Sequence, residues 1–300
     1  MRFSIAIPAY KPDYLVEAVA SVLAQTFSDW ELVVVDDCSP ADLRSIVVPF
    51  LADSRVRYYR NEKNIGALDV VDNWNRCLDY CTGDYVICMG DDDRLLPVCL
   101  QELTKTISEN TGYGVYHLLT ELIDEEGCVI ERLESRPDKE SPLEIMLRRW
   151  EGRNQFIGDF CFQRQRLIAN GGFFKLPLAW GADDITVYLA AKGNNDMVEG
   201  IININVPLFQ YRVNAQTLSS SSDYKLKMRA MRAYSDWFEN ELGEAFKPMI
   251  RKYFVKQAKW YIRQDVHSRQ GNLFYWLEHR EESRLPYHTI LLQSIKGLIK

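Results

Sequence analysis

The chain has 300 residues, 47% of them hydrophobic and 26% charged, with a formal net charge of −6. This is enough chain to bury a large core, and the composition excludes fibrous, disordered and disulfide-scaffold proteins. The net charge combines an acidic part, residues 1–223, with 21 Lys and Arg against 34 Asp and Glu, and a basic part, residues 224–300, with 15 against 8.

The first ninety residues alternate short β-branched runs with amphipathic stretches. The runs predict strands at 3–7, 31–35, 56–59 and 85–89, and the stretches between them predict helices at 14–25, 41–51 and 68–81. Continuous apolar strands such as 32–35 are typical of a parallel sheet covered on both faces. Right-handed crossovers then place every strand's carboxyl end on one edge, where ligands bind.

The middle of the chain predicts strands at 115–119 and 201–206 and helices at 142–150 and 184–191, which extend the same sheet. A serine run at 219–222 interrupts the pattern, so we expect a boundary near residue 220. Four helices are predicted beyond it, at 224–242, 246–263, 273–282 and 287–299.

No apolar run reaches the roughly 18 to 20 residues that a membrane span needs, and the apolar start of the chain is too short for a signal peptide. The seven cysteines are scattered and odd in number, which indicates reduced core residues. We therefore expect a cytoplasmic protein.

The turns after the first two strands carry different signals. Residues 7–12 (Ile-Pro-Ala-Tyr-Lys-Pro) lack the glycine-rich turn of a dinucleotide fold, which disfavours a classical NAD site. Asp36 and Asp37 follow the second strand, where a carboxylate can accept hydrogen bonds from a ribose hydroxyl or a base N–H. One of the polar residues there is also expected to cap the following helix.

Three adjacent carboxylates, Asp91, Asp92 and Asp93, follow the fourth strand. Neighbouring carboxylates raise one another's pKa unless a cation lies among them. A hard divalent ion, Mn²⁺ or Mg²⁺, would satisfy them and leave positions for a diphosphate, although an acidic triplet is as often a solvated loop or helix cap.

A second acidic pair, Asp183 and Asp184, opens the helix predicted at 184–191 and follows Trp180 and Gly181. The helix dipole favours acids in the first turn, which explains one of the two. It does not explain the aromatic residue and the glycine before them.

Taken together, these sites resemble the family 2 glycosyltransferases, inverting nucleotide-sugar enzymes of the GT-A fold. The resemblance covers residues 3 to about 222 and rests on seven pieces in order: Ile5–Tyr10, Val35–Ser39, Asn64–Gly66, Gly83–Val86, Asp91–Asp93, Ala182–Asp184, and Tyr211 and Arg212 leading to Ser219. It implies an α/β fold with a mostly parallel central sheet, a GT-A domain at 1–222 (nucleotide-binding half 1–93, acceptor half 94–222) and a helical C-terminal region at 223–300.

The resemblance also implies roles for individual residues in the nucleotide-binding half. Pro8, Ala9 and Tyr10 would line the nucleotide pocket, Asp36 or Asp37 would hold the base or ribose, and Asn64 and Gly66 would shape the far side. Asp92 would ligate the metal directly, with Asp91 and Asp93 supporting it or reaching the ribose. Gly90 stands where the family often has Asp.

In the acceptor half, Asp184 matches the family's catalytic base, and Asp183 stands where Glu is usual. A base must remove the proton of the acceptor hydroxyl as it attacks the anomeric carbon, and burial near Trp180 would raise a carboxyl's pKa toward that role. Arg212 would assist the leaving diphosphate through charge-assisted hydrogen bonds. Asn214 stands where relatives often carry histidine.

The function implied is transfer of a sugar from a nucleotide-sugar, a UDP-sugar by preference, to an acceptor hydroxyl in bacterial surface polysaccharide biosynthesis. The alternatives are a non-catalytic nucleotide-sugar binding or scaffold protein and, less favoured, a sugar-phosphate nucleotidyltransferase. The acceptor would be a glycan or lipid-linked molecule at the inner face of the membrane.

The basic, aromatic-rich tail, residues 224–300, allows several interpretations. Its helical spacing favours packing on the catalytic domain or in a homodimer, and peripheral membrane contact through residues 288–300 ranks just below. Nucleic acid is a poor third, because the acidic body would repel it.

Overall fold

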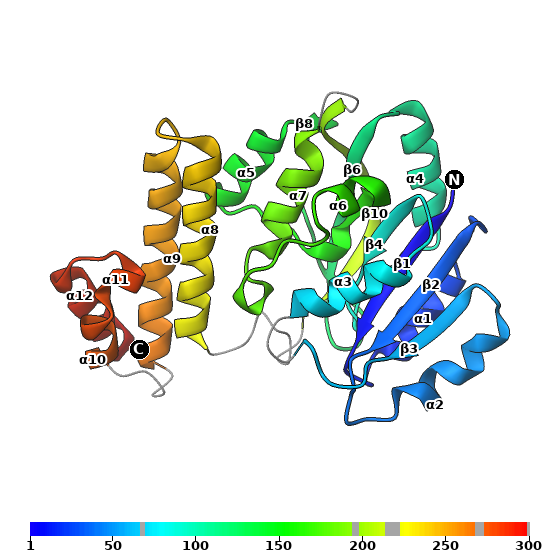
Figure 1. Cartoon of the computed structure of the whole chain (residues 1–300), viewed down its shortest axis with the longest axis horizontal. Coiled ribbons are helices and arrows are strands. Elements are labelled where there is room, and N and C mark those ends of the chain that lie inside the picture. The colour runs from blue at the N-terminus through cyan, green and yellow to red at the C-terminus, as the bar shows by residue number, and fades with distance from the viewer. Residues whose placement is uncertain (67–69, 194–197, 214–222, 268–272, 299–300) are drawn as a thin grey trace. The chain divides into compact units, whose positions relative to one another are not determined.

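A computed structural model of the chain describes residues 1–66, 70–193, 198–213, 223–267 and 273–298 (Figure 1). The chain divides into two units: the first is Met1–Phe174 with Asp183–Asn214, and the second is Lys175–Ala182 with Ala215–Lys300. The boundary expected near residue 220, the serine run at 219–222 and Asn214 lie outside the described residues. The division of residues 1–222 into two halves therefore stays a prediction.

The first unit is built on one mixed sheet with the strand order β3-β2-β1-β4-β9-β6-β10-β5, to which β7 adds at β6 and β8 at β10. The strands are β1 (Phe3–Ala9), β2 (Trp30–Asp36), β3 (Val56–Arg60), β4 (Tyr85–Cys88), β5 (Arg94–Leu95), β6 (Tyr113–Ile123), β7 (Val129–Arg132), β8 (Lys139–Glu140), β9 (Phe160–Gln163) and β10 (Val198–Arg212).

The helices of the first unit follow the strands in the chain. They are α1 (Leu15–Leu23), α2 (Leu43–Val47), η1 (Val48–Ala52), α3 (Val70–Tyr80), α4 (Cys99–Glu109), α5 (Pro142–Glu151), η2 (Ile157–Asp159), α6 (Arg164–Ala169) and α7 (Ala182–Lys192).

The predicted β-α alternation of the first ninety residues is confirmed. Strands β3, β2, β1 and β4 are neighbours and all run parallel. The helix expected at 41–51 is instead divided into α2 and η1, because Pro49 in the first turn of η1 has no N–H for a continuous helical ladder.

Side chains alternate between the two faces of this sheet, which places the core. On β1, Phe3, Ile5 and Ile7 join the buried residues of α1, α2 and α4 in one cluster, whereas α3 contacts β1 and β2 from the other face. Helices therefore cover both faces, as the continuous apolar strands predict, and the carboxyl ends of β1, β2 and β4 are left at one edge (Figure 1).

The middle segment extends the sheet, as expected, but not with parallel strands alone. β9 lies antiparallel between β4 and β6, and β6 pairs in parallel with β10. The short η2 turn just before β9 carries Asp159 into the interior, where its side chain is fully buried.

The second unit is helical in its described part. It contains η3 (Pro177–Ala179), α8 (Tyr224–Leu242), α9 (Lys247–His267), α10 (Leu273–Glu278), α11 (Arg280–Ser283) and α12 (Tyr287–Leu298). α8 packs on α9, and the indole N–H of Trp180 donates to the Tyr261 hydroxyl of α9 at 2.5 Å.

One helix of the second unit differs from the sequence prediction. The helix expected at 273–282 is broken at His279, whose ring stacks on Tyr275 with centroids 4.2 Å apart. None of the described helices combines the length and the apolar character required to cross a bilayer.

Candidate active site

The turn after β1 is bonded to the acidic triplet after β4. The Asp91 carboxylate accepts hydrogen bonds from the backbone N–H groups of Tyr10 at 2.7 Å and Lys11 at 2.8 Å. The Lys11 ammonium lies 3.8 Å from a carboxylate oxygen of Asp92. The Ser39 hydroxyl, after β2, donates to the Tyr10 carbonyl at 2.6 Å. Three strand ends that are far apart in the sequence are therefore joined at one edge.

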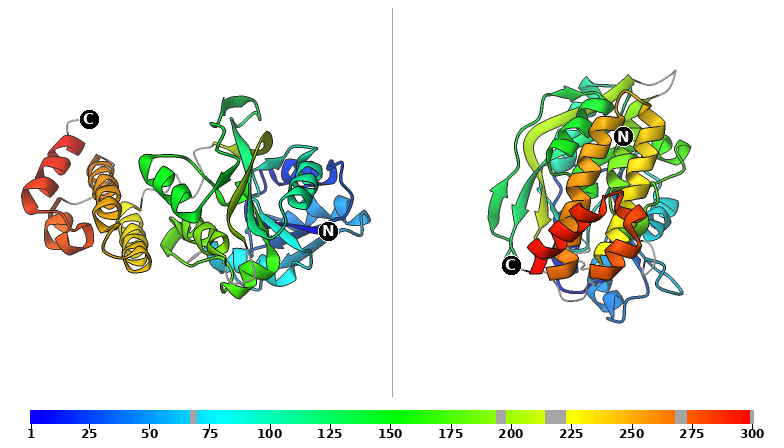
Figure 2. Two further views of the ribbon diagram at one scale, coloured as in Figure 1. Left: turned by 90° about the horizontal axis from the view of Figure 1, so that it is seen from above. Right: turned by 90° about the vertical axis from the view of Figure 1, so that its left-hand side faces the viewer.

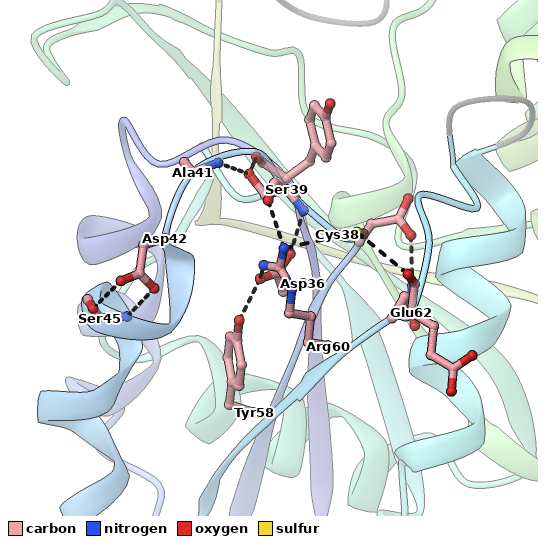
Figure 3. A network of polar contacts seen from close by, with 12 residues as sticks. Asp36, Cys38, Ser39, Ala41, Asp42, Ser45, Tyr58, Arg60 and Glu62 are labelled. Carbon is pink, nitrogen blue, oxygen red and sulfur yellow. Dashed lines mark hydrogen bonds and ion pairs between the residues drawn. The ribbon is translucent and has the colours of Figure 1, made fainter.

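Asp36 is fully buried at the end of β2, and its carboxylate is bonded within the protein (Figure 3). One oxygen accepts the backbone N–H of Ser39 at 2.8 Å. The other accepts the Tyr58 hydroxyl at 2.5 Å and forms an ion pair with Arg60. Burial, followed by the bond to Asp36, raises the pKa of Tyr58 to about 12. Asp36 thus links β3 and the turn after β2 to the end of β2.

Asp37 organises the segment that carries Asn64 and Gly66. Its carboxylate accepts the Asn61 side-chain amide at 2.7 Å and the backbone N–H groups of Ile65 at 3.0 Å and Gly66 at 2.7 Å. A Cβ at Gly66 would lie 2.7 Å from that carboxylate, so only glycine allows this approach. The structure brings Asp37 and Gly66 together, and the roles of Asp37, Asn64 and Gly66 in a nucleotide pocket stay predictions.

The triplet itself is mostly buried, with Asp91 8% and Asp93 5% exposed. Burial raises the pKa of Asp91 to about 6, and Asp92 adds to the rise, against the opposing effect of the two backbone donors. Burial and Asp92 also hold the pKa of Asp93 well above its ordinary value. A Cβ at Gly90 would lie 2.8 Å from a carboxylate oxygen of Asp93 and 2.9 Å from one of Asp92, so a larger residue there would require these carboxylates to shift.

The donor chemistry of the triplet fits a hard divalent cation. In the described ranges no three His, Cys, Asp or Glu side chains are grouped so that they alone would hold a metal ion. Mg²⁺, however, is usually held by one or two carboxylates together with water and substrate phosphates. Asp92 is the most exposed of the three side chains, at 14%, which suits direct ligation, while backbone N–H groups hold Asp91 and Asp93.

Arg212 lies beside the triplet, at the end of β10, and is fully buried. Its backbone N–H donates to Asp93 at 3.0 Å, and its guanidinium lies 4.0 Å above the Tyr14 ring. The guanidinium donates to the Asp92, Asp124 and Glu125 carbonyls at 2.9 Å each and to the Glu17 carboxylate at 2.7 Å. Arg212 therefore holds β10, α1 and the triplet together, and its predicted contact with the diphosphate stays a prediction.

The two acids that begin α7 differ in their surroundings. Asp184 is 1% exposed; its carboxylate pairs with Arg149 Nε at 3.1 and 3.2 Å and accepts the Gln155 amide at 2.6 Å. Asp183 is only partly buried, yet desolvation and the adjacent Asp184 raise the pKa of its carboxyl above the ordinary value. Trp180, expected next to this pair, belongs to the second unit.

Sequence reasoning missed a cluster of buried polar side chains close to Asp184, which we call the buried polar cluster: His117, Arg136, Arg153, Gln155, Asp159 and Asn203. Within the described residues, each has at least one buried side-chain nitrogen or oxygen without a hydrogen-bond partner in the protein. Such atoms in native proteins are normally satisfied by ordered water or a ligand. These residues come from separated segments and form no motif, so spacing alone gave no signal for them.

The sequence model described as "Glycosyl transferase family 2" matches residues 4–170, more than half of the chain. This chain belongs to glycosyl transferase family 2. The match covers the joined ends of β1, β2 and β4, and the predicted glycosyltransferase activity is confirmed at the level of the family.

Two bacterial relatives align with this family 2 chain over most of its length. One is the Escherichia coli "UDP-Glc:alpha-D-GlcNAc-diphosphoundecaprenol beta-1,3-glucosyltransferase WfgD", 27% identical over 247 residues, which are 81% of this chain and 89% of the relative. The other is the "Putative teichuronic acid biosynthesis glycosyltransferase TuaG" of Bacillus subtilis, 24% identical over 86% of this chain and 91% of the relative.

Solved structures confirm the predicted fold. S. aureus TarS 1-349 superposes with a TM-score of 0.65 at 18% identity, over 99% of this chain and 92% of that chain. The same protein in complex with UDP-GlcNAc gives a TM-score of 0.63 at 16% identity over the same shares. The family 2 chain thus has the α/β architecture expected of it, with helices following the sheet.

Proposed function

We propose that this family 2 chain is an inverting, metal-dependent glycosyltransferase that moves a sugar from a UDP-sugar to a hydroxyl of a lipid-linked acceptor during bacterial surface polysaccharide synthesis. The observation that carries the proposal is the joined edge of the sheet, where Asp91 bonds the Tyr10 turn and Asp37 bonds the Gly66 segment. The Tyr10 ring, 42% exposed, and the Asp92 carboxylate are the groups at that edge that would meet the nucleotide-sugar.

The acceptor side of the proposal centres on α7. The contacts of Arg149 and Gln155 orient the Asp184 carboxylate, and a carboxylate has about four lone-pair sites, so Asp184 Oδ2 retains capacity for an acceptor hydroxyl. We assign the base role to Asp184. Asp183, beside it and more exposed, is the second candidate.

Mn²⁺ or Mg²⁺ is the proposed cofactor, and Asp92 its first protein ligand. When bound, a divalent ion supplies Lewis-acid stabilisation of the departing diphosphate. The chain's own contribution is to hold the triplet in place, through the backbone N–H groups of Tyr10 and Lys11 on Asp91 and that of Arg212 on Asp93.

The names of the relatives support the proposed substrates. WfgD is named for UDP-glucose and a diphosphoundecaprenol acceptor, and TarS was solved with UDP and with UDP-GlcNAc. An acceptor of this kind would place the enzyme at the inner face of the cell membrane. Peripheral membrane contact and a homodimer both remain predictions.

The test is a transfer assay with a panel of UDP-sugars, Mn²⁺ and a synthetic sugar-diphospholipid acceptor, read by UDP release, product mass and anomeric configuration. We expect inverted product from the wild-type protein and at least about a hundredfold lower kcat from Asp92→Asn and from Asp184→Asn. Asp79→Asn is the matched control, because its carboxyl on α3 is 66% exposed and lies outside the site.

Full turnover in Asp92→Asn or Asp184→Asn would remove that residue from its role, and loss of turnover in Asp183→Asn alone would transfer the base role to Asp183. Binding of UDP-sugars without turnover on any acceptor would instead favour a scaffold protein.

A further inference from the structure

The last described helix, α12, turns most of its large apolar side chains outward. Positions 287, 291, 295 and 298 recur at helical spacing and share one side of the helix. We call this side, with the adjoining Leu292, the α12 apolar face. Its exposed fractions are 54% for Tyr287, 44% for Leu291, 48% for Leu292, 43% for Ile295 and 68% for Leu298.

The opposite side of α12 is small and polar, and it is buried. Gln293, Ser294 and Gly297 are buried there together with Ile290. A Cβ at Gly297 would lie 2.6 Å from the Arg263 carbonyl of α9, so glycine permits the close approach of the two helices seen in Figure 2. Apart from Ile290, the helix therefore packs on its own unit through small and polar groups, whereas a typical amphipathic surface helix buries its apolar side.

We propose that the α12 apolar face inserts into the interfacial region of an anionic lipid bilayer. An amphipathic helix bound in this way lies in the plane of the membrane, with its apolar side in the boundary between headgroups and acyl chains. Tyr287 suits that position, because a tyrosine ring combines an apolar body with a polar end.

The charges of α12 and of the tail as a whole favour an anionic surface. α12 contains no Asp or Glu, and its exposed charged side chain is Lys296, with His288 also exposed. Residues 224–300 as a whole carry 15 basic against 8 acidic residues. Basic residues near an anionic membrane each strengthen binding by attraction to the lipid headgroups.

A second copy of the chain is a weaker candidate than a bilayer for covering the α12 apolar face. The face has five side chains on one helix of 12 residues, whereas a stable interface usually takes about 20 to 30 residues from each partner.

This inference rests on the proposed function in one respect: membrane binding would bring the enzyme to a lipid-linked acceptor, which lies in the membrane. Binding itself is measured without turnover. The full chain is sedimented with vesicles of phosphatidylglycerol and phosphatidylcholine and with vesicles of phosphatidylcholine alone. We expect binding to the anionic vesicles that weakens with added salt.

The decisive variant is Leu291→Gln with Leu298→Gln, because glutamine keeps helix propensity while removing exposed apolar surface. Its affinity for anionic vesicles is expected to fall at least about tenfold. The matched control is Val48→Gln with Ile168→Gln, which changes two apolar side chains of the first unit that are 46% and 49% exposed. The control should bind as the wild type does.

Equal binding of the variant and the control, or no sedimentation of the wild type, would overturn the proposal. So would a wild-type dimer, seen by light scattering, that the α12 variant converts to monomers. The transfer assay with the sugar-diphospholipid acceptor, run in detergent without vesicles, separates the two proposals: if transfer is absent there while vesicle binding holds, the proposed function fails and this inference stands.

Discussion

Asp159 shows how burial alone changes the chemistry of a single residue. Its carboxyl is fully buried and accepts the Phe156 backbone N–H at 3.2 Å and the Thr120 hydroxyl at 3.3 Å. Burial raises its pKa to about 7, although the nearby Arg136 opposes the rise. Beside it, His117 lies 3.7 Å away, and burial holds the pKa of that imidazole well below its usual range.

A raised carboxyl pKa means that the folded state binds the proton more tightly than the unfolded state. The stabilisation is complete below the unfolded pKa, near 4, and is lost as the pH rises to about 7. Between pH 5 and pH 8 the free energy of unfolding should therefore fall by about 2 kcal/mol more in the wild type than in Asp159→Asn. Urea unfolding at a series of pH values measures this, and parallel curves for the two proteins would refute it.

At the scale of elements, Arg212 shows how one side chain fixes the relation between distant strands. It joins the end of β10 to the triplet after β4 and to Glu17 of α1. A lysine would keep the charge but lose the planar set of donors that reaches four oxygens.

We expect Arg212→Lys to lower the free energy of unfolding by about 3 kcal/mol, because buried acceptors lose their partners. Arg132→Lys is the control: Arg132 pairs with Glu121 at 2.8 Å, but its side chain is 62% exposed, so its loss should stay within about 1 kcal/mol. Equal losses in urea unfolding of the two variants would contradict the structural role of Arg212.

At the scale of the whole molecule, ligand binding should appear as a change in global stability. A ligand that binds only the folded state stabilises it by about 2.7 kcal/mol at a hundred times its dissociation constant, which corresponds to several degrees in Tm. We expect Mn²⁺ to raise the Tm of the full chain further when UDP is present.

The Asp92→Asn variant should keep the rise in Tm caused by UDP and lose the further rise in Tm caused by Mn²⁺. The Asp79→Asn variant should keep both rises. A wild-type Tm that does not respond to Mn²⁺ in the presence of UDP would contradict the proposed metal. Differential scanning fluorimetry over a Mn²⁺ titration is sufficient for this measurement.

The helices and strands of the first ninety residues, and the edge where they meet, could be predicted from the sequence. Apolar runs such as 32–35 specify buried parallel strands, and parallel strands with right-handed crossovers must end together. The motifs at those ends, with the acids of α7, were enough to indicate the family.

Only the tertiary structure decided what each of these residues contacts. The Asp36 carboxylate is bonded by Tyr58 and Arg60, and Asp93 is bonded by Arg212, 119 residues away. The antiparallel strand β9 was not predicted, and the sequence indicated an amphipathic C-terminal helix without showing that its apolar side faces outward. The physical reason is that periodicity specifies an element and its two sides, whereas the partner of a buried charge and the side of a helix that meets the core depend on segments distant in the sequence.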